Sequence, residues 1–142
     1  MDELHGYSFE ELTIGQSAIF TKTVTEADVV LFSAVSGDTN PVHLSDEYAA
    51  TTLFKGRIAH GMLSAGFISA VFGTKLPGPG CIYISQTLRF KAPVKIGDTV
   101  LARVTVIELE AEKKRVHFHT VCSVGGTTVI EGEAVLMVPS RG

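Results

Sequence analysis

The sequence predicts an α+β domain in which a curved antiparallel sheet wraps around one long buried helix. The stretch HGMLSAGFISAVFG, which begins at His60, carries apolar or small residues around its whole helical circumference, as is typical of a buried helix. The segments after residue 80 alternate apolar and polar residues and are separated by short turn signals, which favours strands joined by hairpins. Because no other long helix is available to cover such a sheet, the sheet is expected to close around this one.

The first half of the chain is expected to contain one strand and two shorter helices. Residues 16–24 alternate weakly as a strand. Thr25 heads a helix, with Asp28 three positions later as in a capping box, and Gly37 ends it. Ser45 and the two acids after it mark the start of a second short helix, since a hydroxyl and carboxylates suit the exposed amides there.

The second half is expected to be the long helix and the sheet. The helix that begins at His60 ends before the Gly-Pro-Gly of residues 78–80. Gly125 and Gly126 form a two-residue hairpin signal between the last two strands. Strands are predicted over residues 81–94, 98–110, 114–124 and 127–138.

Length and composition indicate one globular domain over residues 1–142. With 142 residues, 45% of them hydrophobic, the chain can bury a sizeable core. The N-terminus does not resemble a targeting segment, and no apolar run approaches the roughly 20 residues that span a bilayer. A cytoplasmic location without membrane contact is therefore expected.

Charge and cysteine usage narrow the kinds of partner. The net charge is −3 and there is no basic block, so no nucleic-acid partner is expected. Cys81 and Cys122 are far apart without CxxC spacing, which indicates reduced thiols rather than a disulfide framework or zinc site. A small molecule is the favoured kind of ligand.

The stretch DTNPVH places Asp38 and His43 in one short segment. Pro41 is expected to block regular helix here and to hold the chain in a compact turn, so both side chains can face one cavity. A carboxylate and an imidazole within reach of one water can divide the removal and delivery of a proton. Alternatively, Asp38 forms an Asx turn, Asn40 and Pro41 shape the loop, and His43 bonds a backbone carbonyl. The spacing alone leaves both interpretations open.

His60 and Gly61 form a second candidate site where the long helix begins. A helix N-terminus exposes unpaired amides with partial positive charge, and a glycine lets a ligand carbonyl approach the Gly61 N–H. Such a site can stabilise an enolate oxygen. The alternative is a plain helix start, in which His60 is a cap and Gly61 relieves crowding.

Metal and serine-nucleophile chemistry are not favoured. His117 and His119 lie two apart on one face of a predicted strand, but no acid or cysteine is spaced with them as further ligands. Ser64 and Ser69 lack the Gly-x-Ser-x-Gly frame of a serine nucleophile. No metal site is therefore expected.

With DTNPVH, then AHGMLSAGFIS, then LRFKAPVKIGDTV in this order, the chain resembles the (R)-specific enoyl-CoA hydratases of the MaoC-like, hot-dog-fold family. The resemblance covers nearly the whole chain. Its most specific element is the Asp-x-Asn-Pro-x-His turn, followed about seventeen residues later by His-Gly-Met.

The resemblance implies a single hot-dog unit that forms a homodimer. It also implies a lyase that adds water reversibly to a trans-2-enoyl-CoA, or to a carrier-protein-linked substrate, without a metal or redox cofactor. Asp38 and His43 would be the catalytic pair that holds the water, and Asn40 would support their loop. The Gly61 amide would receive the thioester oxygen, and Ser69 would lie near the active site.

Two other functions remain as alternatives. A hot-dog thioesterase would hydrolyse the same thioester with an acid and a helix-end amide. A non-catalytic module that binds acyl-CoA or acyl-carrier protein would have no use for an acid/base pair. The DTNPVH turn favours the hydratase over both.

Overall fold

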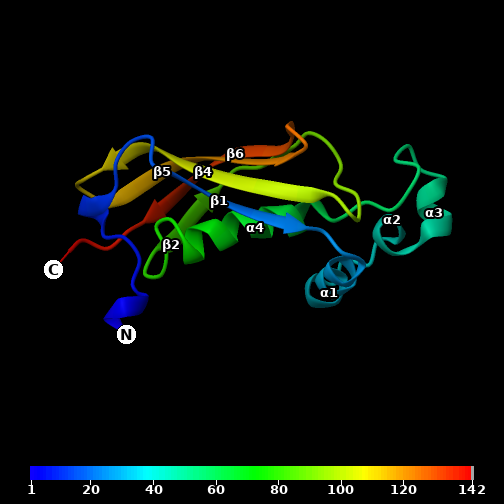
Figure 1. Ribbon diagram of the computed structural model, residues 1–142, viewed down its shortest axis with the longest axis horizontal. Coiled ribbons are helices and arrows are strands. Elements are labelled where there is room, and N and C mark those ends of the chain that lie inside the picture. The colour runs from blue at the N-terminus through cyan, green and yellow to red at the C-terminus, as the bar shows by residue number, and fades with distance from the viewer. Residues whose placement is uncertain (142) are drawn as a thin grey trace.

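The computed structural model of the protein describes residues 1–141 and contains a six-stranded antiparallel sheet with one long helix against it (Figure 1). The strands are β1 (Ser17–Thr23), β2 (Ile82–Gln86), β3 (Arg89–Phe90), β4 (Thr99–Glu110), β5 (Arg115–Val124) and β6 (Thr127–Met137). The helices are α1 (Glu26–Ser36), α2 (Pro41–Leu44), α3 (Asp46–Ala50) and α4 (Gly61–Thr74), preceded by 3-10 turns at Asp2–Leu4 and Phe9–Glu11.

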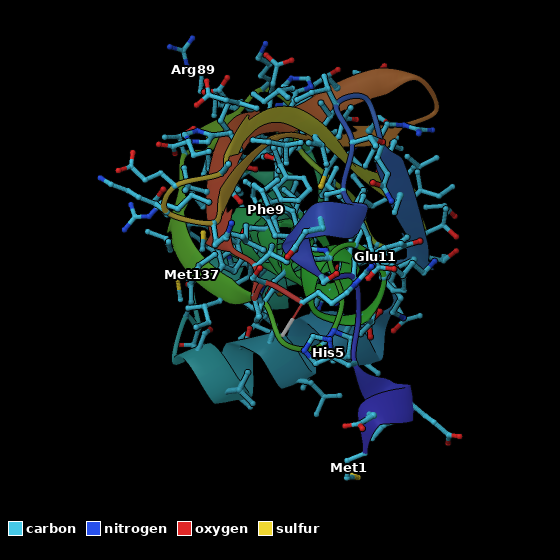
Figure 2. The ribbon with its side chains drawn as sticks, turned by 90° about the vertical axis from the view of Figure 1, so that its left-hand side faces the viewer. Met1, His5, Phe9, Glu11, Arg89 and Met137 are labelled. Carbon is cyan, nitrogen blue, oxygen red and sulfur yellow. The ribbon has the colours of Figure 1, made fainter. Side chains whose placement is uncertain are left out.

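The sheet has the order β1-β4-β5-β6-β2, with β3 paired to β6, and it curls around α4 (Figure 2). This arrangement confirms the predicted α+β class with a curved antiparallel sheet around a central helix. The core lies between α4 and the inner face of the sheet. Its largest fully buried side chains include Ile68, Val71, Phe72, Val100, Val104, Phe118, Ile130 and Leu136.

Local signals set the ends of several elements. Thr25 and Asp28 form the expected capping box at the start of α1, and Gly37 ends the helix with a left-handed φ of 81°. Gly125 and Gly126 both have positive φ, and Val124 pairs with Thr127 across them, so the predicted two-residue hairpin is confirmed.

Helices α1, α2 and α3 lie beyond one end of the sheet, close to where α4 begins (Figure 1). The prediction that Pro41 blocks helix is wrong, because Pro41 is the first residue of α2. A proline at this position loses no intrahelical hydrogen bond, and its fixed φ suits a helix start.

The predicted continuous strand over residues 81–94 is also wrong. Strand β2 ends at Gln86, and β3 contains only two residues. Between them the backbone of Thr87 presses against β6, where a Cβ added at Gly132 would lie 1.8 Å from the Thr87 oxygen. This contact needs a glycine opposite it, and the chain leaves the regular ladder there.

Helix α4 is buried on one side only, which corrects the expectation of burial all round. Phe67, Ile68, Val71 and Phe72 face the sheet and are buried. Met62 is 55% exposed, and the small residues Gly66, Ser69 and Gly73 lie on the same uncovered face of the helix. The sheet of one chain curves around only part of the helix, so this face has no cover within residues 1–141.

No helix among the described residues combines the length and apolar character needed to cross a bilayer. The longest one, α4, has 14 residues.

Candidate active site

Asp38 lies in the short connection between α1 and α2. Its Oδ1 accepts a hydrogen bond from the Asn40 amide at 3.2 Å, which forms an Asx turn. Asn40 is the N-cap of α2, and its side chain accepts from the Val42 amide at 3.0 Å. The turn is thus built by side chains that satisfy its own amides, and it leaves Asp38 Oδ2 outside this network.

His43 lies in α2 and is held from the opposite side. Its Nδ1 lies 2.7 Å from the carbonyl oxygen of Ile58. Because a carbonyl only accepts, Nδ1 carries the proton, and the lone pair of a neutral ring is on Nε2. That Nε2 lies 3.8 Å from Asp38 Oδ2. His43 is 7% exposed, whereas the Asp38 side chain is half-exposed.

The two interpretations that the sequence left open are both present in this geometry. Asp38 does form an Asx turn through Oδ1, and His43 does bond a carbonyl through Nδ1. Each side chain nevertheless has a second polar atom, and these two atoms face each other across 3.8 Å. The two structural hydrogen bonds therefore orient the side chains and leave Asp38 Oδ2 and His43 Nε2 free to bind a third group.

His60 packs directly on this pair. Its ring stacks on His43 with the centroids 3.8 Å apart, and its Nε2 lies 3.0 Å from the Asp38 carbonyl oxygen. The same Nε2 lies 3.0 Å from the hydroxyl of Ser33, a buried residue of α1. Sequence inspection missed Ser33, because its only signal is a serine on the buried side of α1, which is also common in ordinary packing.

Gly61 begins α4, so its amide is at the exposed end of the longest helix. The ring of Phe90 lies where a side chain would stand, since a Cβ at Gly61 would be 2.5 Å from Phe90 Cε1. Both residues line a cavity of about 300 Å³. We call this space the Gly61 cavity; its other lining residues include Phe54, Ile58, Ser64, Pro93 and Ile130.

Ser64 is the one buried hydroxyl in the wall of the Gly61 cavity. Ser64 is fully buried, and its Oγ has no hydrogen-bond partner within residues 1–141. Gly61 and Ser64 are three positions apart and so lie on the same side of α4. A ligand in this cavity would meet a backbone amide and a hydroxyl in otherwise mostly apolar surroundings.

Ser69 does not join the Gly61 cavity. It lines a different space, of about 580 Å³, together with Met62 and Gly66 of α4 and Tyr83 and Gln86 of β2. We call this space the Ser69 cavity. Of the predicted site residues, the structure brings Asp38, Asn40, His43 and Gly61 to the start of α4 and places Ser69 further along the helix, on another face.

Asp38, His43 and His60 could also be considered as metal ligands, because one ligand atom of each lies within 4.8 Å of the others. The two imidazole rings are stacked with 26° between their planes, and each nitrogen lone pair lies in the plane of its ring, so the lone pairs of the two rings lie in nearly parallel planes, which is unfavourable for binding one ion. His60 Nε2 is moreover engaged with Asp38 and Ser33. The arrangement fits a hydrogen-bonded acid/base pair better than chelation.

His117 and His119 face outward on β5, away from this site. Contrary to the sequence expectation, acids do lie beside them, because neighbouring strands bring Glu108 and Glu110 next to His117, and Glu131 next to His119. The hydrogen bond from His117 lowers the pKa of Glu110. Periodicity along one strand cannot reveal such cross-strand neighbours.

The chain matches the family model described as MaoC like domain over residues 10–132. A protein of Rhodospirillum rubrum named (R)-specific enoyl-CoA hydratase is 62% identical over 141 residues, which cover 99% of this chain and 98% of that protein.

Two solved structures are also similar over most of their length. R-Hydratase PhaJ1 from Pseudomonas aeruginosa superposes with a TM-score of 0.91 at 50% identity, covering 96% of this chain and 88% of that one. The (R)-hydratase from Aeromonas caviae, described as involved in PHA biosynthesis, gives a TM-score of 0.89 at 43% identity, covering 92% of this chain and 99% of that one. The likeness covers nearly the whole chain, including the sheet, α4 and the α1–α2 region that contains Asp38 and His43.

Proposed function

The chain belongs to the MaoC-like domain family, and from this premise we propose that it is an (R)-specific enoyl-CoA hydratase. The sheet wrapped around α4 is the hot-dog fold. The enzyme is a hydro-lyase that adds water reversibly to a trans-2-enoyl-CoA and forms the (R)-3-hydroxyacyl-CoA. Asp38 and His43 are its catalytic residues.

One observation carries the proposal most directly: Asp38 Oδ2 and His43 Nε2 face each other at 3.8 Å. The usual length of a hydrogen bond to water is about 2.8 Å. A water at this distance from both atoms fits a separation of 3.8 Å between them. An ionised carboxylate and a neutral imidazole nitrogen both accept, so the water donates both protons to the pair and turns its lone pairs outward. The oxygen is thereby presented as a nucleophile.

The addition then needs two proton transfers, one from the water to the Asp38–His43 pair and one from the pair to the substrate. As the water oxygen bonds to the β-carbon, one member of the pair takes a proton from the water. The same proton is delivered to the α-carbon, so one water is added in full and the pair returns to its starting state. Because both events occur at one site, oxygen and hydrogen add to the same face of the alkene.

Negative charge collects on the thioester oxygen during this addition. The Gly61 amide at the N-terminus of α4 provides a donor for that oxygen, and the helix dipole favours the charge. Asn40 maintains the turn through its cap of α2. Ser69 is assigned a contact with the substrate from the Ser69 cavity, which it lines together with Tyr83 and Gln86 of β2.

We propose further that the enzyme works as a homodimer in the cytoplasm. Strand β2 is one end of the sheet, and its residues Ile82, Tyr83 and Ile84 are each at least 40% exposed. An apolar edge strand of this kind is suited to pair with a second copy. That copy would also cover Met62 and the small residues of α4, and would close the Ser69 cavity.

The A. caviae relative is described as involved in PHA biosynthesis, and we extend that role to this chain. Its product would then serve as a precursor of polyhydroxyalkanoate.

The test is incubation with crotonyl-CoA while enoyl absorbance and free thiol are followed separately. A hydratase removes the enoyl absorbance without releasing thiol, and chiral analysis identifies the (R)-alcohol. Thiol release would indicate the thioesterase, and binding without either change would indicate a non-catalytic module. An (S) or racemic product would contradict the assignment.

A further inference from the structure

His60 contacts three separate parts of the candidate active site. It precedes α4 and is almost fully buried. Its Nε2 lies 3.0 Å from the Asp38 carbonyl oxygen, and because a carbonyl only accepts, this nitrogen carries the proton. Ser33 Oγ is a second partner at the same distance, and the ring stacks on His43. One side chain therefore touches the turn that bears the carboxylate, the catalytic imidazole and α1.

Capping of α4 does not account for this residue. An N-cap side chain normally accepts a hydrogen bond from one of the next amides, but His60 makes no such bond. Its Nδ1 is buried and has no partner within the described chain. An unpaired buried polar atom costs about 1–3 kcal/mol, which serine or aspartate at this position would avoid. The contacts that His60 does make are with the active-site turn, with the His43 ring, and with Ser33 and Phe32 of α1.

We propose that His60 is a positioning residue for the Asp38–His43 pair, with Ser33 as its anchor in α1. His60 fixes the Asp38 backbone through Nε2 and the His43 ring by stacking. Because His60 is bonded directly to Gly61, the same residue sets the distance between the pair and the amide that receives the thioester oxygen. The inference rests on the proposed hydratase function, but its structural part can be tested without activity.

Three variants separate the contacts. Ser33→Ala removes the anchor, His60→Phe keeps a ring that can stack on His43 but loses the hydrogen bonds, and His60→Leu loses both. Displacement of reacting groups by about 1 Å can cost on the order of 100-fold in rate. Turnover should fall least in Ser33→Ala, roughly 10-fold in His60→Phe and roughly 100-fold in His60→Leu, with KM within about 3-fold. His117→Phe, on the outer face of β5, is the matched control and should keep normal turnover.

A double-mutant cycle distinguishes positioning from general support of the fold. If His60 acts through the pair, His60→Phe should cause no further loss of turnover in an Asp38→Ala protein. A purely structural role would lower turnover by the same factor in both backgrounds, and that result would overturn the proposal.

Proton exchange measured by NMR on ¹⁵N-labelled protein supplies the readout that needs no activity. The Asn40 amide, which reports on the Asp38 turn, should exchange faster in both His60 variants. The His43 Nδ1 proton should exchange faster in His60→Leu than in His60→Phe. Unchanged exchange in folded variants would refute the positioning role, whereas the expected exchange in a protein without hydratase activity would refute the proposed function alone.

Discussion

Asp38 Oδ2 lies 3.8 Å from His43 Nε2, while Asp38 Oδ1 and His43 Nδ1 are each held by a backbone group. The gap is too long for a direct hydrogen bond and suits a shared water. Both side chains are anchored from behind, so neither can simply turn to close the gap. The two side chains are thus preorganised to bind one water between them.

The first prediction concerns each member of the pair. Asp38→Ala and His43→Ala should each lower turnover by at least about 100-fold, on the order of 3 kcal/mol in the barrier, as expected for loss of a general acid or base. Steady-state kinetics with crotonyl-CoA measures the effect. Asp46→Ala in the first turn of α3 and His117→Ala on β5 are the controls, and both should stay within a few-fold of the wild type. Near-normal turnover in the Asp38 or His43 variants would mean that the turn is only structural.

The second prediction concerns the pair as a unit. If both residues act on one water, the Asp38→Ala/His43→Ala protein should be little slower than either single variant, because the second deletion removes a partner that is already idle. The same kinetic assay decides this. Losses that add in free energy would indicate separate tasks for the two groups.

The third prediction concerns the close contact at the start of α4. A methyl group at Gly61 would meet the Phe90 ring at 2.5 Å, and Phe90 is 54% exposed, so the ring should be pushed aside into the Gly61 cavity. Gly61→Ala should therefore lower kcat/KM by roughly 10-fold, about 1.4 kcal/mol. In a Phe90→Ala protein, Gly61→Ala should lower kcat/KM only slightly, because the ring that the methyl group meets is absent.

Gly56→Ala is the control for this prediction, since an added Cβ there meets nothing within 4 Å. It should leave kcat/KM within about 2-fold of the wild type, as expected for a substitution that displaces no neighbouring atom. An equal loss from Gly61→Ala with and without Phe90 would show that the clash is not the cause.

The fourth prediction concerns assembly. Light scattering should give a mass of about 30 kDa, twice the 15.2 kDa of one chain. Ile82→Lys on β2 should shift the protein toward the monomer, because it places a charge on the proposed pairing edge. Ile107→Lys on β4, at a similarly exposed isoleucine, should remain dimeric. A monomeric wild type at micromolar concentration would contradict the proposed homodimer.

The fifth prediction concerns the cysteines. Burial raises the pKa of Cys122 to about 12 and also raises the pKa of Cys81. Only the thiolate attacks a thiol reagent, and with a pKa of about 12 roughly one Cys122 in ten thousand is ionised at pH 8. In a Cys81→Ser protein the native state should therefore barely react with a disulfide reagent at pH 8, and should react fully in denaturant. Rapid reaction of the native protein would contradict the burial of Cys122.

Local sequence determined much of the fold. The capping box at Thr25, the hairpin at Gly125–Gly126 and the strands over β4, β5 and β6 depend on backbone preferences and on periodicity within a few residues, so they were readable in advance. Where a tertiary contact overrode the local pattern, the prediction failed. The strand expected over residues 81–94 is interrupted because Thr87 meets Gly132, a residue 45 positions away.

By itself, the sequence determined which residues could form the site: the DTNPVH motif and the His-Gly helix start mark Asp38, His43 and Gly61 as candidates. Only the tertiary structure decided how they are held. Ile58 orients His43, Ser33 and His60 brace the turn, and Phe90 covers Gly61. These partners come from distant parts of the chain, and spacing within a motif carries no information about them. The physical reason is that a hydrogen bond or a ring stack depends on the distance and orientation of two groups in space, which the folded chain sets and the order of residues does not.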